Sequence, residues 1–152
     1  MRGRNGRNSL DPFLPLTCDG GMRNRTRLLA ATVALALAQI VHAAAPVGTE
    51  GESLVGPIVG LGLLVAAVVA AVGAFRSSSW APRLALVTGA LVAGGFVVYH
   101  ATPVHSPVTN PYVGEPVGAP GWVSVALAVA AGVWAAVEGW RALPERADRT
   151  VT

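Results

Sequence analysis

The sequence predicts an all-α membrane protein, an antiparallel four-helix transmembrane bundle with both termini in the cytoplasm (N-in/C-in) and a Pro-rich outer loop. The composition points away from a soluble domain, because 53% of the 152 residues are hydrophobic and 12% are charged, against about 25% charged in an average soluble domain. Four apolar stretches are long enough, or nearly so, to cross about 30 Å of hydrocarbon at about 1.5 Å per residue. The third observation is the placement of arginine, which sets the orientation.

Arginine supplies all eleven basic side chains, in three groups. The groups are Arg2, Arg4, Arg7, Arg23, Arg25 and Arg27; Arg76 and Arg83; and Arg141, Arg146 and Arg149. The segments 45–53 and 101–121 contain none. Because cytoplasmic loops of membrane proteins carry the excess of basic residues, we expect both termini and the loop 76–83 in the cytoplasm and the two arginine-free loops outside.

The net charge of +3 and the isoelectric point near 10.0 would indicate a nucleic-acid partner in a soluble domain. The positive-inside pattern already explains the arginines, so we expect no nucleic acid as partner. The expected partners are the lipid bilayer and either other membrane protein subunits or a second copy of the chain.

The first 26 residues mix Arg, Asn, Gly and Pro with one short apolar cluster, so we expect a disordered basic cytoplasmic tail at residues 1–26. Met22 directly precedes the first apolar run and is an alternative translation start to Met1. The single cysteine, Cys18, has no second thiol for an intramolecular disulfide or a cysteine-rich metal site, and we interpret it as inert.

The membrane domain is expected over residues 27–143, followed by a cytoplasmic tail at residues 144–152. Its four spans are expected at about residues 28–45, 53–75, 82–100 and 122–140. The first also resembles a signal peptide, because an Arg-rich lead and an apolar stretch precede small residues suited to cleavage. We favour a retained span, since a fourth helix lets a small bundle bury more of its faces.

Several local features support these spans. Ser53 is the expected N-cap of the second span, with Pro57 in or near its first turn. Small residues recur four apart, which lets helix backbones approach closely, either inside the bundle or in a dimer. Examples are Gly56 and Gly60; Gly89 and Ala93; Ala90 and Gly94; and Ala128, Gly132 and Ala136.

The outer loop 101–121 contains five prolines, which exclude a helix and predict an extended, turn-rich cover over the outer end of the bundle. All three histidines are expected on this side: His42 ends the first span, His100 ends the third, and His105 lies in the loop. With Glu50, Glu52 and Glu115 they are candidate ligands for zinc or copper. The competing interpretation is interfacial histidines with a polar tip in water.

A metal site requires the histidines of the first and third spans to meet. Helix ends in a four-helix bundle are roughly 10 Å apart, so the two rings approach only if the helices are adjacent or the loop folds inward. We expect the ring nitrogens of His42 and His100 to lie more than roughly 12 Å apart, a separation that would exclude a shared metal, whose bonds to nitrogen are about 2.0 to 2.1 Å.

Glu138 is the only acidic residue within an expected span, three residues before Arg141. It has two interpretations, a carrier of protons or cations and an interfacial ion pair with Arg141, and we favour the pair. No catalytic or phosphate-binding motif occurs in the sequence. We therefore expect no enzyme activity and no cofactor.

Three stretches give the chain a recognisable layout: Gln39-Ile40-Val41-His42 before a short acidic loop, the inner turn from Arg76 to Arg83, and Phe96-Val97-Val98-Tyr99-His100. This layout resembles small four-span bacterial membrane proteins from GC-rich genomes, whose functions are mostly uncharacterised. The resemblance covers roughly residues 27–143, and implies a four-helix integral membrane protein without assigning an activity. The expected location is the plasma membrane, as a multi-pass protein.

The expected function is that of a non-enzymatic membrane protein, structural or accessory to a larger complex, because small-residue faces are plentiful and polar groups within the spans are few. The alternative is a metal-handling or small-solute transport protein that uses the outer histidines.

Overall fold

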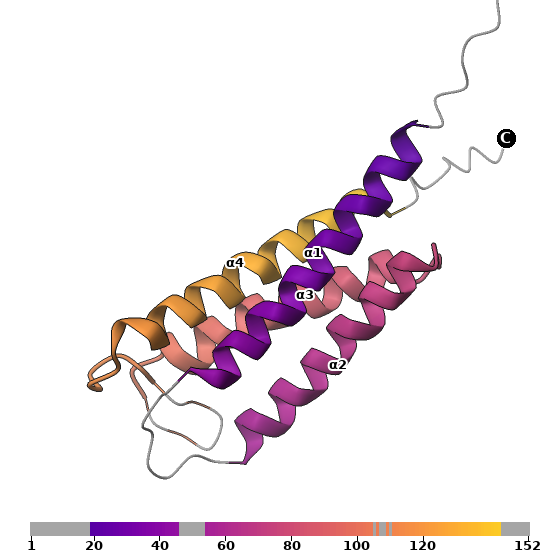
Figure 1. The fold of residues 1–152 in the computed structure, drawn as a ribbon. Helices are drawn as coiled ribbons and strands as arrows, with labels where there is room; N and C mark the ends of the chain where they lie inside the picture. The colour runs from indigo at the N-terminus through magenta and orange to yellow at the C-terminus, as the bar shows by residue number, and fades with distance from the viewer. Residues whose placement is uncertain (1–18, 46–53, 105, 107–108, 110, 144–152) are drawn as a thin grey trace, which may run out of the picture.

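The computed structural model describes residues 19–45, 54–104, 106, 109 and 111–143, with the side chains of residues 19–21 excepted. Within these residues the chain forms four helices (Figure 1). They are α1 (Asp19–Ala44), α2 (Val55–Phe75), α3 (Ala81–Ala101) and α4 (Ala119–Arg141). An isolated bridge between Ser106 and Thr109 is the only β pairing among the described residues.

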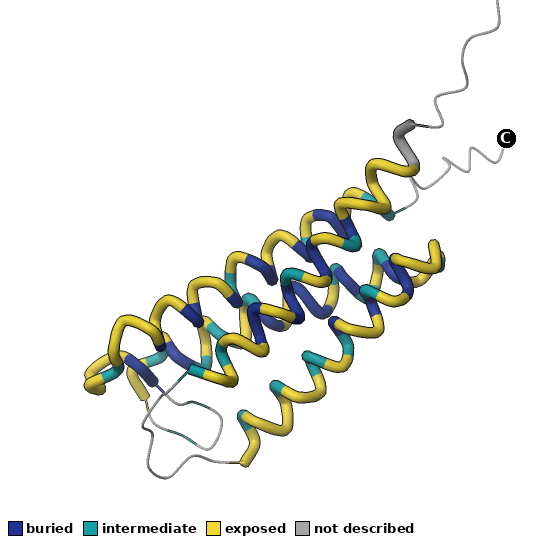
Figure 2. The backbone as a smooth tube through the Cα atoms, viewed as in Figure 1, coloured by how far each residue is buried: buried dark blue, intermediate teal, exposed yellow. Residues whose placement is uncertain are grey.

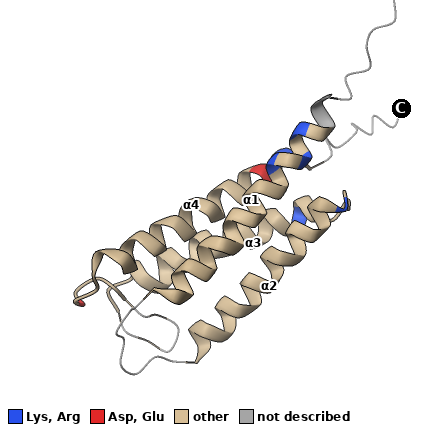
Figure 3. Ribbon diagram, in the orientation of Figure 1, with Lys and Arg blue, Asp and Glu red and all other residues tan. Residues whose placement is uncertain are grey.

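The four helices lie side by side as a bundle, and consecutive helices run in opposite directions (Figure 1). One end of the bundle, called here the histidine end, holds the last residues of α1 and α3 and the first residues of α2 and α4. The opposite end, called the arginine end, holds the described arginines (Figure 3). Each helix is long and apolar enough to cross a membrane, by length and composition. The all-helical fold is thus confirmed, while the side of the membrane that each end faces stays a prediction.

The closest helix packing joins α3 and α4 through glycines. A Cβ built on Gly89 would lie 2.5 Å from the carbonyl oxygen of Gly132, and one on Gly139 would lie 2.6 Å from the backbone nitrogen of Leu86. α1 packs against α4 and α2, and α2 against α3, while α1 and α3 meet across the bundle diagonal. In this part of the chain, the small residues of α3 and α4 serve packing within the bundle.

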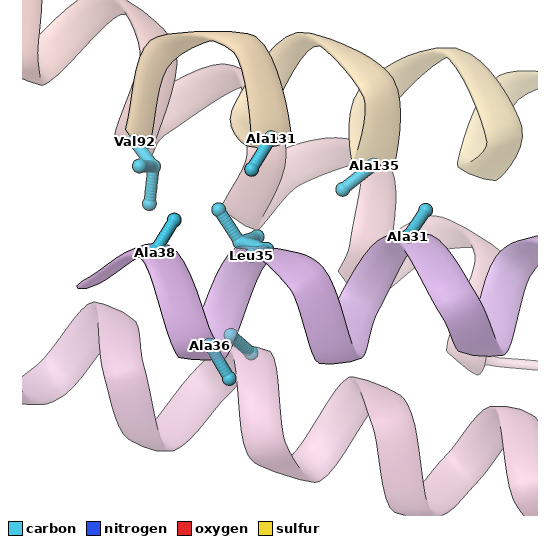
Figure 4. Packing of buried hydrophobic residues seen from close by; sticks show 8 residues of the cluster. Ala31, Leu35, Ala36, Ala38, Val92, Ala131 and Ala135 are labelled. Atoms are coloured by element: carbon cyan, nitrogen blue, oxygen red, sulfur yellow. The ribbon is translucent and has the colours of Figure 1, made fainter. Parts of the chain in front are cut away.

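The main apolar core lies between the helices and consists mostly of alanine (Figure 4). Its buried members are Ala31, Leu35, Ala36, Ala38, Ala67, Val92, Ala131 and Ala135. Four of these eight residues belong to α1. The first apolar run therefore forms an integral part of the bundle rather than a separate element.

α2 is the least buried helix (Figure 2). In the most apolar 18-residue stretch of α2, 22% is buried, against 39% in the corresponding stretches of α1 and α4. Its exposed side chains include Leu61, Val65 and Val68. A face of this composition is suited to contact lipid chains or another apolar helix.

The helix starts differ from the sequence expectations. α1 begins at Asp19, so the expectation of a disordered tail up to residue 26 was wrong for its last part. Extending a helix that the apolar run has already nucleated costs little. Arg25 also anchors this segment, because its Nε donates to the carbonyl oxygen of Ala74 at 3.2 Å and its Nη2 to that of Phe75. A cation at the C-terminal carbonyls of α2 is favourable.

Two further boundaries required correction. Leu54, without a side-chain capping bond, is the N-cap of α2, so the expected cap at Ser53 was wrong, and Ser53 itself lies outside the described residues. α4 begins at Ala119, within the expected loop 101–121, because Pro120 falls in the first helical turn, where a missing N–H costs nothing. The described residues between Thr102 and Gly118 are non-helical, with a turn near Gly114 at φ +89°.

Candidate functional site

The structure brings His42 of α1 and His100 of α3 into contact. Their ring centroids are 5.1 Å apart and the ring planes are inclined by 64°. The expected separation of more than roughly 12 Å was therefore wrong. The interior of the bundle is narrow because alanine and glycine dominate its helix contacts, so two large rings at the ends of diagonally opposed helices can meet at its centre.

His100 is buried in a group of aromatic rings. Its side chain is 4% exposed, and its ring centroid lies 4.1 Å from that of Tyr112, 4.9 Å from that of Tyr99 and 5.7 Å from that of Phe96. The backbone N–H of Tyr112 donates to the carbonyl oxygen of His100 at 2.9 Å. For His100 the interpretation as an interfacial histidine with its polar tip in water therefore fails, because the residue is enclosed.

His42 is held by α4. Its Nδ1 lies 2.9 Å from Oγ of Ser124, and that hydroxyl donates to the carbonyl oxygen of Gly121 at 2.7 Å. A serine hydroxyl carries one proton, so which of the two groups donates in the contact between His42 and Ser124 follows from the tautomer of the imidazole.

Of the remaining candidate ligands, Glu115 is the one that lies among the described residues. His105, Glu50 and Glu52 lie outside the described residues, and Glu115 is exposed in the loop between α3 and α4. Among the residues that the structure places, no group of three or more His, Cys, Asp or Glu side chains could hold a metal ion. Of the three predicted ligands, His42 and His100 are brought together, and His105 lies outside the described residues.

Two polar residues of the site were missed by the sequence reasoning, Ser124 and Gln39. Gln39 is 6% exposed, and its Nε2 has no hydrogen-bond partner among the described residues. It lies four residues after the buried Leu35 and three before His42, on the inward face of α1. The available signal was a strongly polar side chain inside an apolar span, which is costly in a membrane and therefore informative.

Glu138 lies near the arginine end, far along α4 from the histidines. Its Oε1 accepts a hydrogen bond from Nη1 of Arg141 at 3.1 Å, and the two side chains are 7% and 60% exposed, respectively. The favoured interpretation as an ion pair with Arg141 agrees with this contact, although the carboxylate is buried rather than open to water.

Comparison with known proteins yields no relative. No protein-family model matches the chain, and no curated protein or solved structure matches it.

Proposed function

We propose that the chain is a small multi-pass protein of the plasma membrane, without catalytic activity, that is structural or accessory to a membrane complex. Its layout fits the small bacterial four-span proteins that the sequence resembles. The proposed orientation places both termini and the arginine end in the cytoplasm and the histidine end outside.

One observation carries this proposal: the helices of the described bundle share a core of alanine, leucine and valine. Where a buried hydroxyl occurs in α1, at Thr32, it bonds to carbonyl oxygens of its own helix, those of Leu28 and Leu29. A conduction pathway is normally lined by ionisable or hydrated groups, whereas the buried residues described in the bundle are mainly apolar. The buried polar ones are Thr32, Gln39, Thr88, His100, Ser124 and Glu138. The core therefore favours a packing role over transport.

The least buried helix supplies the surface that a partner would use. α2 exposes Leu61, Val65 and Val68, and a Cβ added at Gly60 or Gly62 would meet no heavy atom within 4 Å. Helices in lipid associate where small residues permit close approach. We therefore expect a partner helix from another subunit to pack on this face.

The test is purification of the tagged full chain from its native membranes in a mild detergent. A second subunit in fixed stoichiometry is expected, and it should be lost in a Gly60→Leu variant. Leucine in place of the exposed Val133 of α4 is the matched control and should retain the subunit. A chain that is recovered alone at native expression levels would contradict the accessory role.

A second candidate function, metal handling or small-solute transport at the histidine end, is favoured by the contact between His42 and His100. Its test is elemental analysis of the purified chain, in which a stoichiometric metal should be present and should be lost in a His100→Ala variant.

A further inference from the structure

We infer that the arginine end binds one anionic phospholipid, with its phosphate between Arg23 and Arg27 and an acyl chain along the exposed face of α1. This lipid site rests on the membrane placement in the proposed function, and it requires neither a partner subunit nor a metal. Four features support it: the charge of this end, the spacing of the two arginines, their depth in the membrane and the apolar face next to them.

The arginine end has a large excess of positive charge. The described arginines there come from all four helices and the residues next to them: Arg23, Arg25, Arg27, Arg76, Arg83 and Arg141 (Figure 3). Glu138, an acidic side chain at the same end, is bonded to Arg141. The sequence of α1 contains three arginines and one acidic residue, Asp19. A surface of this charge attracts the anionic lipids of a cytoplasmic leaflet.

Arg23 and Arg27 form a pair of like charges on one face of α1. They lie one helical turn apart, and both are exposed. Arg25, two residues from each, lies about 200° away around the helix, where it donates to the carbonyl oxygens of Ala74 and Phe75. Like charges four residues apart repel each other. A phosphate between them removes this repulsion, and each guanidinium can bind phosphate oxygens through paired N–H groups.

The depth of the pair matches a lipid headgroup. From Arg27 to its last residue, Ala44, α1 is about 26 Å long at about 1.5 Å per residue, close to the hydrocarbon thickness of about 30 Å. Arg27 therefore lies near the boundary of the hydrocarbon, and Arg23 lies about 6 Å further out. Trp80 and Trp140, which are 45% and 68% exposed, lie at the same end of the bundle, as expected of interfacial aromatic residues.

The face of α1 that carries the two arginines continues as an apolar face. At about 100° per residue, Ala30, Leu37 and Val41 fall on the same side of the helix as Arg23 and Arg27. Ala30 is exposed, and Leu37 and Val41 are 57% and 49% exposed. A molecule with an anionic head and an apolar chain matches both parts of this surface, whereas a free phosphate or a nucleic acid matches only the charged part.

The experiment is native mass spectrometry of the full chain in a mild nonionic detergent. Phosphatidylglycerol or phosphatidylcholine with the same acyl chains is added stepwise. One phosphatidylglycerol per chain is expected, and it should be retained where phosphatidylcholine dissociates. At about 5-fold for each basic residue next to an anionic lipid, Arg23→Gln should weaken binding about 5-fold. The double variant Arg23→Gln/Arg27→Gln should weaken it about 30-fold.

The matched control is Arg76→Gln/Arg83→Gln, which removes the same charge from two exposed positions at the same end. It should keep the bound lipid. Equal losses in the two double variants would mean that the lipid responds to diffuse charge, and the site between Arg23 and Arg27 would be wrong. Circular dichroism and gel filtration show whether each variant is folded, and the single variants Arg23→Gln and Arg27→Gln decide the question if a double variant is not.

Two competitors test the choice of ligand. Glycerol phosphate, which lacks acyl chains, and a single-stranded oligonucleotide should both fail to displace phosphatidylglycerol. Displacement by either would overturn the lipid site in favour of a phosphate or nucleic-acid site. Equal binding of phosphatidylglycerol and phosphatidylcholine would overturn the lipid site alone, whereas a chain that stays in solution without detergent would contradict the membrane placement itself.

Discussion

Gly89 of α3 and Gly132 of α4 face each other backbone to backbone. A Cβ on Gly89 would lie 2.5 Å from the carbonyl oxygen of Gly132, and a Cβ on Gly132 would lie 2.8 Å from the carbonyl oxygen of Gly89. Both distances are shorter than real Cβ contacts allow. The two helices therefore approach as closely as they do only because neither residue has a side chain. The same two helices carry His100, near the end of α3, and Ser124, near the start of α4.

Replacing Gly89 by alanine should destabilise the bundle. The new methyl group meets backbone atoms, which cannot rotate away, so α3 and α4 must separate. Overpacking of this kind typically costs about 1 to 3 kcal/mol. The measurement is reversible unfolding of the detergent-solubilised chain in SDS, followed by circular dichroism.

Gly94→Ala is the matched control, because a Cβ at Gly94 meets no heavy atom within 4 Å. Its stability should equal or exceed that of the parent chain, since alanine is the better helix former. Equal stability of the two variants would show that the α3–α4 contact is looser than these distances imply.

Arg25→Ala should weaken the attachment of the first turns of α1 to the end of α2. Arg25 donates to the carbonyl oxygens of Ala74 and Phe75, and its guanidinium carbon lies 5.9 Å from the centroid of the Phe75 ring. Loss of these interactions at an exposed helix end should cost about 1 kcal/mol in the free energy of unfolding. The same SDS titration measures it.

Arg23→Ala provides the comparison, because it removes the same charge from an exposed position two residues earlier. A loss of stability of the same size in both variants would indicate an effect of net charge, and the specific contacts of Arg25 would then contribute nothing.

The proposed orientation predicts opposite labelling of two serines. In a Cys18→Ser background, Ser106→Cys should react with a membrane-impermeant maleimide in intact cells, whereas Ser78→Cys should react only after permeabilisation. Ser106 lies in the loop between α3 and α4, and Ser78 lies between α2 and α3. The reverse labelling pattern would exclude the N-in/C-in topology.

The four helices could be predicted from the sequence because their length and apolar composition are properties of each segment alone. The spacing of Gly89 and Ala93 and that of Ala128, Gly132 and Ala136 predicted close approach of helix backbones, inside the bundle or in a dimer, but did not predict that α3 pairs with α4. The helical start of α1 could not be predicted, because it involves Arg25 and the carbonyls of Ala74 and Phe75, which are distant in the sequence.

The candidate site was predictable only in part. Because the first and third spans run in the same direction, the sequence predicted that His42 and His100 lie at one end of the bundle. Their contact depends on how far α1 and α3 approach across the diagonal. Ser124 and Gln39 are single polar residues in apolar spans, and no local pattern shows that Ser124 supports a histidine while the amide of Gln39 is buried without a partner among the described residues. Those relationships follow from the helix rotations that packing sets.

Gln39→Met should stabilise the metal-free chain. The Nε2 of Gln39 is buried without a partner among the described residues, and an unsatisfied buried donor costs about 1 to 3 kcal/mol. Methionine has a similar length and no donor, so the free energy of unfolding in SDS should rise by about 1 kcal/mol. Ile40→Met, at a neighbouring position that is 49% exposed, controls for the general effect of methionine and should be neutral. A Gln39→Met variant less stable than the parent would mean that the amide is hydrogen-bonded in the folded protein.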